Sequence, residues 1–295
     1  MSNYYMSPII LTLFAMLAFA ANSVLCRLAL VNHAGEASID AASFTSIRLL
    51  SGAIILILIL LVRTREFKPK NINPISASML FIYAICFSFS YIEISTGTGA
   101  LILFGTVQLT MIMFGLIKGE RSGYLALMGI LLAFTGLVYL LLPSVSAPPI
   151  MSALLMMVAG LAWGIYSLRG KAISNPLIAT SWNFIGTLPL VLLTYLIFQD
   201  DVYLTQKGIV LAILSGALAS GVGYSIWYAA LPHLTTTRAA TVQLTVPIIA
   251  ATGGIMLLSE PVSLRLVIAS TAVLGGVYLT IKSAKYEKHY RKIEP

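Results

Sequence analysis

Charged residues are scarce in this sequence. Asp, Glu, Lys and Arg make up 9% of its 295 residues, whereas soluble domains carry about 25%. A chain with so few charges lacks the side chains that a water-facing surface needs. Hydrophobic residues make up 59% and occur in long blocks, and residues 54–62 contain no polar side chain. The composition therefore excludes an ordinary soluble domain.

Cysteine and histidine are also rare, which argues against several chemistries. Cys26 and Cys86 lie inside apolar blocks and are interpreted as small buried side chains, with no disulfide or metal-ligand spacing. His33, His233 and His289 fall at loops or in the tail, and no His-Glu-x-x-His motif occurs. A phosphate-binding Walker loop is missing too. We therefore expect no cofactor, no metal site and no ATP hydrolysis.

The long apolar blocks predict membrane-spanning helices. A helix needs about 20 apolar residues to cross a hydrocarbon core of about 30 Å, and its backbone groups must bond internally. The first segment is interpreted as an uncleaved helix, because no basic residue precedes it. Turn signals separate ten expected helices, near residues 8–31, 43–63, 74–92, 97–118, 122–143, 150–171, 177–198, 207–231, 238–258 and 262–283.

The basic residues indicate how these helices are oriented. With the N-terminus inside, fourteen of the eighteen Lys and Arg residues fall at inner ends, in inner loops or in a basic tail at 284–295. Because cytoplasmic loops are enriched in Lys and Arg, both termini are predicted to be cytoplasmic in a protein of the inner membrane. The net charge of +8 then reflects this bias and the anionic bilayer surface, and not a nucleic-acid partner.

The chain repeats itself at an interval of about 140 residues. Glu120 and Glu260 each lie between two apolar segments, and Gly136 meets Gly276 in the same register. Each half therefore holds five helices, and an odd number makes the second half start on the opposite side of the membrane. We expect an all-α integral membrane protein with ten transmembrane helices in two inverted five-helix repeats. This architecture is typical of secondary transporters, which bind substrate near the midplane between the halves.

The combined pattern resembles the EamA family of the drug/metabolite transporter superfamily. The features that carry the resemblance are the five-plus-five layout, the Gly-Glu and Ser-Glu-Pro turns at 119–120 and 259–261, Trp163-Gly164, and the run at 96–105. The sequence departs from the family pattern at Asn22-Ser23, where Trp-Gly is frequent, and at Val107, where the ninth segment has Pro247. These departures leave the substrate open.

The resemblance covers nearly the whole chain and has several implications. It implies EamA-like five-helix repeats at 1–143 and 150–283. It implies a carrier for small organic solutes, often an exporter of amino acids or related metabolites. It also implies a central cavity lined by the first, third, fourth, sixth, eighth and ninth segments.

Charged and polar residues within the spans are candidates for substrate binding. Arg27 and Arg48 lie toward the outer ends of their segments, and two interpretations stay open for them. They snorkel or form ion pairs at the interface, or one of them binds a substrate carboxylate in an outward-facing vestibule. Uncharged polar residues lie deeper, and each can serve either as hydrogen-bonded glue between helices or as part of a binding set.

Aromatic residues form a further group of candidates. Trp163 and Tyr224 lie deeper than an interfacial belt and are expected in a cavity wall. Apolar and aromatic walls with few polar groups suit a neutral or zwitterionic, partly apolar solute. The predicted substrate-binding residues are Asn22, Arg27, Arg48, Tyr91, Gln108, Trp163, Tyr166, Asn183, Tyr224, Trp227 and Gln243.

The predicted function is secondary transport of a small organic metabolite by alternating access, with export of an amino acid or related solute favoured. The alternatives are an intramembrane enzyme, which would need a nucleophile–base pair or metal set that the sequence does not show, and a non-transporting scaffold, which would not need inverted symmetry. The expected partners are a small-molecule substrate and the lipid bilayer, and a homodimer stays open. Only Glu93 approaches a membrane-embedded carboxylate, so facilitated diffusion or exchange competes with proton coupling.

Overall fold

The structure is a computed structural model. It describes residues 7–31, 37–64, 72–117, 123–143, 147–170, 173, 175–230, 233–234 and 242–290, with the backbone alone for Thr64, Pro176 and 284–290. These residues form helices and no β-sheet, and one isolated antiparallel bridge joins Ile39 to Leu204. The predicted all-α class is confirmed.

The first five helices follow the predicted segments closely. They are α1 (Pro8–Leu30), α2 (Ala41–Thr64), α3 (Pro74–Ser90), α4 (Thr96–Ile117) and α5 (Tyr124–Leu141). Helices α1 and α3 begin with proline, whose fixed φ and missing N–H suit a first helical turn. The Asn73 side chain caps α3 by accepting a hydrogen bond from the Ser76 backbone N–H at 3.0 Å.

The second half is more broken. Its elements are α6 (Ile150–Gly170), α7 (Pro176–Gly186), α8 (Leu188–Ile197), the short 3-10 helix η1 (Gln199–Asp201), α9 (Gln206–Ile213), the π-helix η2 (Leu214–Val222), α10 (Gly223–Ala230), α12 (Thr245–Leu258) and α13 (Leu264–Tyr290). The predicted helix at 177–198 divides at Thr187, because Pro189, two residues later, cannot donate a backbone hydrogen bond.

Among the described residues, eight helical stretches are long and apolar enough to cross a bilayer. They are Pro8–Leu30, Ala41–Arg63, Thr96–Ile117, Tyr124–Leu141, Ile150–Gly170, Leu177–Ile197, Gln206–Ala230 and Leu264–Ser283. Two further apolar helices, α3 and α12, are shorter, with 17 and 14 residues. By length and composition, the chain has the build of a multi-pass membrane protein.

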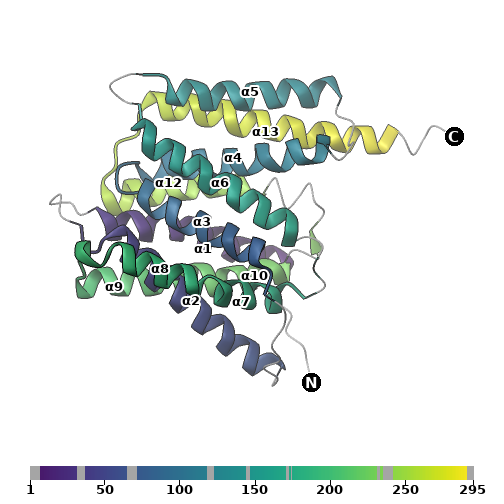
Figure 1. Cartoon of the computed structure of the whole chain (residues 1–295). Helices are drawn as coiled ribbons and strands as arrows, with labels where there is room; N and C mark the ends of the chain where they lie inside the picture. The colour runs from purple at the N-terminus through teal and green to yellow at the C-terminus, as the bar shows by residue number, and fades with distance from the viewer. Residues whose placement is uncertain are drawn as a thin grey trace.

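Helix α1 lies inside the bundle, in contact with α4, η2, α10 and α12. Helices α5 and α13 pack along each other at one edge, and α2 leans away at the opposite edge (Figure 1). Arg27 and Arg169 lie near opposite ends of the bundle, which are called the Arg27 end and the Arg169 end. The Arg27 end gathers the end of α1 and the starts of α4 and α13, whereas Arg169 bonds to Ser76 and Asn73 at the start of α3.

Glycines allow α2 and η2 to approach closely. A Cβ atom on Gly216 would collide with the backbone oxygen of Arg48, and one on Gly52 would lie 3.2 Å from the backbone oxygen of Gly216. Small residues permit this kind of close helix packing in membranes. The approach covers the part of α2 that carries Arg48 and thereby positions the site described next.

Candidate substrate-binding site

A small cavity lies at the centre of the bundle. Its volume is about 10 Å³, which is room for about one water molecule. The cavity is lined from α1, α3, α4, α6, η2 and α10, by Phe19, Asn22, Ser23, Tyr83, Phe87, Leu103, Phe104, Trp163, Ala219 and Tyr224. Five of the six segments that the family resemblance implies therefore line it, and the ninth segment, α12, supplies none of these residues.

A chain of hydrogen bonds runs beside the cavity and links the two halves of the sequence. Ser215 Oγ donates to Asn22 Oδ1 at 2.5 Å, and Asn22 Nδ2 donates to the Tyr83 hydroxyl at 3.2 Å. Arg48 donates from Nη2 to the same hydroxyl at 3.0 Å and from Nε to Ser220 Oγ at 3.3 Å. These five residues are called the Arg48 cluster. All five are buried, so their polar atoms depend on one another or on a ligand.

The π-helix η2 explains how both serines reach this cluster. In an α-helix, with 3.6 residues per turn, residues five apart point about 140° away from each other. A π-helix bonds residue i to i+5, so residues at this spacing lie nearly one above the other. Ser215 and Ser220 are five apart and both lie within η2 (Leu214–Val222). The irregular helix is thus what turns both hydroxyls toward α1 and α2.

Aromatic rings make most of the cavity wall. Trp163 lies 4.8 Å from Tyr83 and 5.0 Å from Tyr224 between ring centroids, and Phe19 meets Tyr224 edge-on at 5.8 Å. Tilted and edge-on rings at 4.5 to 7 Å are favourable pairings. The Tyr83 ring centroid also lies 5.1 Å from the Arg48 guanidinium carbon. The wall therefore combines aromatic rings with a cation that contacts one of them.

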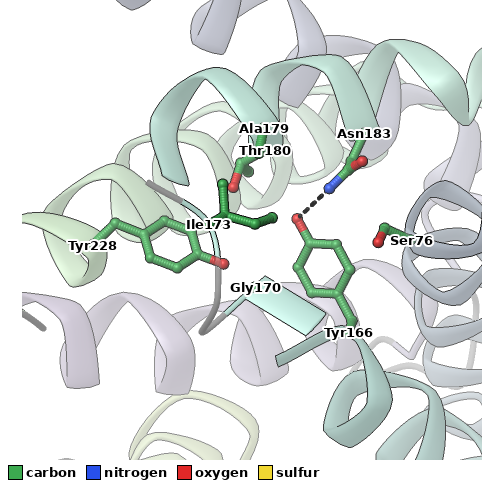
Figure 2. Close-up of a pocket in the computed structure, with 8 residues that line it drawn as sticks. All are labelled: Ser76, Tyr166, Gly170, Ile173, Ala179, Thr180, Asn183 and Tyr228. Atoms are coloured by element: carbon green, nitrogen blue, oxygen red, sulfur yellow. Dashed lines mark hydrogen bonds between the residues drawn. The ribbon is translucent and has the colours of Figure 1, made fainter. Parts of the chain in front are cut away.

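A second small cavity lies toward the Arg169 end (Figure 2). It also has a volume of about 10 Å³, and its lining includes Tyr166, Thr180, Asn183 and Tyr228. Asn183 Nδ2 donates to the Tyr166 hydroxyl at 3.4 Å. The Tyr166 ring lies 5.5 Å from the Trp163 ring, so one aromatic pair separates the two cavities.

Polar contacts close the Arg27 end. Arg27 Nε pairs with Glu260 Oε1 at 3.2 Å, and Arg27 Nη1 donates to the backbone oxygens of Tyr91 and Ile92 at 2.8 and 2.7 Å. Glu260 also accepts the backbone N–H of Thr96 at 2.8 Å, where the start of α4 favours a carboxylate. These five residues are called the Arg27 seal. It joins α1, the turn between α3 and α4, and the loop before α13.

The predicted residues fall into groups. Asn22, Trp163 and Tyr224 line the central cavity, and Trp227 packs edge-on against the cavity residue Phe19 at 5.9 Å. Gln108 is buried one helical turn beyond Phe104, and its Nε2 has no hydrogen-bond partner. Tyr166 and Asn183 belong to the second cavity.

Other predicted residues lie away from the cavities. Arg27 and Tyr91 form part of the Arg27 seal, and the Tyr91 side chain is fully buried. Gln243 lies just before α12 and lines neither cavity. For Arg48 the snorkelling interpretation is wrong, because the side chain is 1% exposed. Glu120, on which the sequence repeat partly rests, lies outside the described residues.

Sequence reasoning missed several cavity residues. Phe19, Tyr83 and Phe87 are ordinary members of apolar helices, and nothing in the sequence marks which of many aromatic rings face inward. Ser215 and Ser220 would point apart on an α-helix, so the sequence did not indicate that they lie at one site. Within the described residues, no three His, Cys, Asp or Glu side chains gather as a metal site. The arrangement suits reversible binding of a small solute inside a membrane protein.

Comparisons with known proteins identify the family. The model of the EamA-like transporter family matches residues 150–282. An uncharacterised protein of Pseudomonas aeruginosa is 50% identical over 273 residues, covering 92% of this chain and 94% of that protein. A probable amino-acid metabolite efflux pump of Salmonella typhimurium is 25% identical over 200 residues, covering 63% of this chain and 67% of the pump.

A solved crystal structure has the same fold. It superposes with a TM-score of 0.64 at 16% identity and covers 95% of this chain and 99% of its own. The protein is thus a multi-pass membrane protein with transporters among its relatives. It belongs to the EamA-like transporter family.

Proposed function

We propose that the protein is a secondary transporter that exports a small organic metabolite, an amino acid or a related solute, across the inner membrane by alternating access. The central cavity carries the proposal, because buried aromatic and polar side chains from both halves of the chain meet there in the middle of apolar helices. The efflux pump of Salmonella typhimurium, a distant relative, supports the solute class. We favour transport over catalysis because of this family membership.

The second part of the proposal is that ten helices form two inverted repeats, at 1–143 and 150–283. The packing of α5 on α13 supports a register of 140 residues. A Cβ atom on Gly136 would lie 3.0 Å from the Val273 nitrogen, and one on Gly276 would lie 2.5 Å from the Ala133 nitrogen. Adding 140 to Gly136 and Ala133 gives Gly276 and Val273, so one contact is the symmetry mate of the other.

Contacts in the centre of the bundle support the same symmetry. Helix α3 packs on α6. The proposed symmetry relates α3 to η2 and α10, and relates α6 to α1. The counterpart of the first contact is therefore the packing of η2 and α10 on α1. Helix α4 packs on α6, and α12 packs on α1. In this arrangement α3 and α12 also cross the bilayer, although they are short, and both termini are cytoplasmic with the basic tail at 284–295 near the headgroups. The bilayer and a small-molecule substrate are the proposed partners.

The transport cycle then alternates between closure at the two ends. The Arg27 end faces outward in this orientation and is closed by the Arg27 seal. In this proposal the structure represents an occluded state, because the central cavity has room for about one water molecule. Substrate would enter from the cytoplasm past Tyr166 and Tyr228 and leave when the seal opens. Two similar halves of opposite orientation give two conformations of similar energy, which this cycle requires.

The experiment that tests the proposal has two stages. An export screen in cells overexpressing the protein measures which amino acids and related solutes accumulate outside. The leading solute is then loaded into proteoliposomes that contain the purified full chain, and its efflux is measured against protein-free liposomes. Saturable efflux is expected. The absence of protein-dependent flux for every solute in the screen would reject the proposal.

A further inference from the structure

Arg48 is a fully buried cation whose neighbours are all neutral. Its side chain is 1% exposed, and the guanidinium donates to the hydroxyls of Tyr83 and Ser220. It also lies 5.1 Å from the Tyr83 ring centroid and 4.9 Å from that of Phe87. Its Nη1 is buried and has no hydrogen-bond partner. Arginine stays charged in proteins. Arg48 therefore holds a full positive charge here, and the N–H groups of its Nη1 are unused donors.

The acidic side chains of the described chain lie elsewhere. One ion pair is found among the described residues, and it joins Arg27 to Glu260 in the Arg27 seal. Asp40 accepts the backbone N–H of Tyr203, and Glu93 accepts from Ser152, both at the Arg27 end. The last two, Asp200 and Asp201, are exposed in η1. None of these five carboxylates compensates Arg48.

Such a cation is expensive to keep. A charged side chain within a membrane helix costs up to about 2.5–3.5 kcal/mol on insertion scales, and a buried charge normally has an ionic partner. The two nearby rings recover part of this cost, and Nε and Nη2 have hydroxyl partners, but Nη1 has none. The cavity next to Tyr83 and Phe87 is where an anionic partner can arrive.

We propose that Arg48 binds a carboxylate of the transported solute, so that the protein selects small carboxylate-bearing substrates. This inference rests on the proposed transport function and adds the chemical class of the solute. The Nη1 edge supplies the unused donors, and a carboxylate matches two parallel N–H groups of a guanidinium. The aromatic rings of Phe19, Trp163 and Tyr224 then face the rest of the solute, where they suit an apolar side chain or an ammonium group.

Charge balance separates a carboxylate from a phosphate ester. Arg48 is the one cation that touches the cluster among the described residues. A single guanidinium neutralises a single negative charge, whereas a phosphate monoester carries about −1.5 to −2 at pH 7. A dianion would therefore keep an uncompensated charge in the low-dielectric interior.

The first test uses the wild-type full chain in lipid nanodiscs. Thermal unfolding is followed with three acid and amide pairs as probes: L-leucine and L-leucinamide, L-phenylalanine and L-phenylalaninamide, and L-threonine and L-threoninamide. At least one acid is expected to raise the melting temperature, and its amide is expected to have no such effect. Equal stabilisation by acid and amide, or no stabilisation by any acid, would overturn the inference.

The second test compares Arg48→Gln with Arg48→Lys and with Arg63→Gln, which removes an exposed cation from the same helix. Because hydrogen bonds to charged groups are worth about 1.5–3 kcal/mol, Arg48→Gln is expected to weaken binding of the acid at least about tenfold and to abolish the preference over the amide. Arg48→Lys keeps the charge without the fork and is expected to retain part of the preference. Arg63→Gln is expected to behave as wild type.

The two tests separate this inference from the proposed function. An unchanged acid preference in Arg48→Gln would overturn the role of Arg48. If efflux from proteoliposomes is saturable but the best solute lacks a carboxylate, the transport function is supported and the selection of carboxylates is rejected. If no solute is carried at all, the proposed transport function itself is rejected. The wild-type acid and amide comparison needs no variant, so a misfolded Arg48→Gln protein would not remove the test.

Discussion

Arg27 and Glu260 form an ion pair with Nε and Oε1 3.2 Å apart, although 233 residues separate them in sequence. The pair is largely buried, with side-chain exposures of 14% and 12%. Each partner also holds the turn between α3 and α4, Arg27 through backbone oxygens and Glu260 through the Thr96 N–H. Opening the Arg27 end therefore requires that these contacts break together.

Glu260→Gln is expected to loosen the Arg27 seal. Removing one member of a buried ion pair leaves the other charge uncompensated, so the closed state loses stability relative to a state open at this end. Cys26 is fully buried next to Arg27 and reports the change. In a Cys86→Ser background, labelling of Cys26 by a membrane-impermeant maleimide should rise several-fold.

Asp200→Asn is the matched control for that measurement. Asp200 is exposed at the same end of the bundle, and its replacement removes the same charge without touching the seal. It should leave Cys26 as unreactive as in the parent protein. Equal labelling in the Glu260→Gln protein and in this control would mean that the ion pair does not hold the end closed.

Two adjacent glycines in α13 provide a direct test of the packing between α5 and α13. A Cβ atom on Gly276 would lie 2.5 Å from the Ala133 nitrogen, whereas one on Gly275 would meet no atom within 4 Å. Gly276→Ala is expected to destabilise the protein by about 1–3 kcal/mol through overpacking. Gly275→Ala should be neutral or slightly stabilising, since alanine favours helix over glycine.

Thermal unfolding in detergent measures both variants. The expected order of melting temperatures places Gly276→Ala clearly below wild type and Gly275→Ala at or above it. If both alanine variants melt together, the two helices do not meet at Gly276, and the contact that supports a 140-residue repeat is lost.

The helical framework could be predicted from the sequence, because long apolar blocks bounded by turn residues leave little freedom. The sixth helix was expected at 150–171 and is found at Ile150–Gly170. The π-helix was not predictable, since Leu214–Val222 is as apolar as its surroundings and its geometry depends on packing against α2. The break at Thr187 had a visible cause in Pro189, but the apolar run continues across it.

The site was predicted less completely than the framework. Asn22, Trp163 and Tyr224 were expected in one cavity, and they line one. For Arg48, snorkelling at the interface and binding of a substrate carboxylate both stayed open, and the close packing of η2 against α2 that buries it rules out the first. That packing depends on glycines far apart in the sequence, so no local pattern could indicate it.

Gln108 can be tested for a role in binding as opposed to helix packing. Its Nε2 is buried and has no hydrogen-bond partner in the closed state, and a buried unsatisfied donor costs about 1–3 kcal/mol. Gln108→Leu is therefore expected to keep or raise the melting temperature while transport falls at least several-fold. Thermal unfolding and proteoliposome flux on the same preparation provide the comparison.

Asn183→Leu supplies the contrast for Gln108. Asn183 donates to Tyr166 at 3.4 Å, so its replacement removes a contact between helices worth about 0.6 kcal/mol on average in membrane proteins. This variant should lose stability slightly. A Gln108→Leu protein that is less stable and transports normally would assign Gln108 to packing.

The inverted repeat predicts the topology of the chain. The residues that follow Glu120 and Glu260 should emerge on opposite faces of the membrane, because five spans separate them in the proposed fold. Single cysteines at Ser122 and Ser263, in a Cys26→Ser, Cys86→Ser background, are labelled in intact cells with a membrane-impermeant maleimide. Ser263→Cys should react from outside, and Ser122→Cys should react only after the membrane is opened.

Lys207→Cys, at the same end as residue 263, should follow Ser263→Cys. Labelling of residues 122 and 263 from the same side would require an even number of crossings between them, and two halves of equal orientation would then replace the inverted pair.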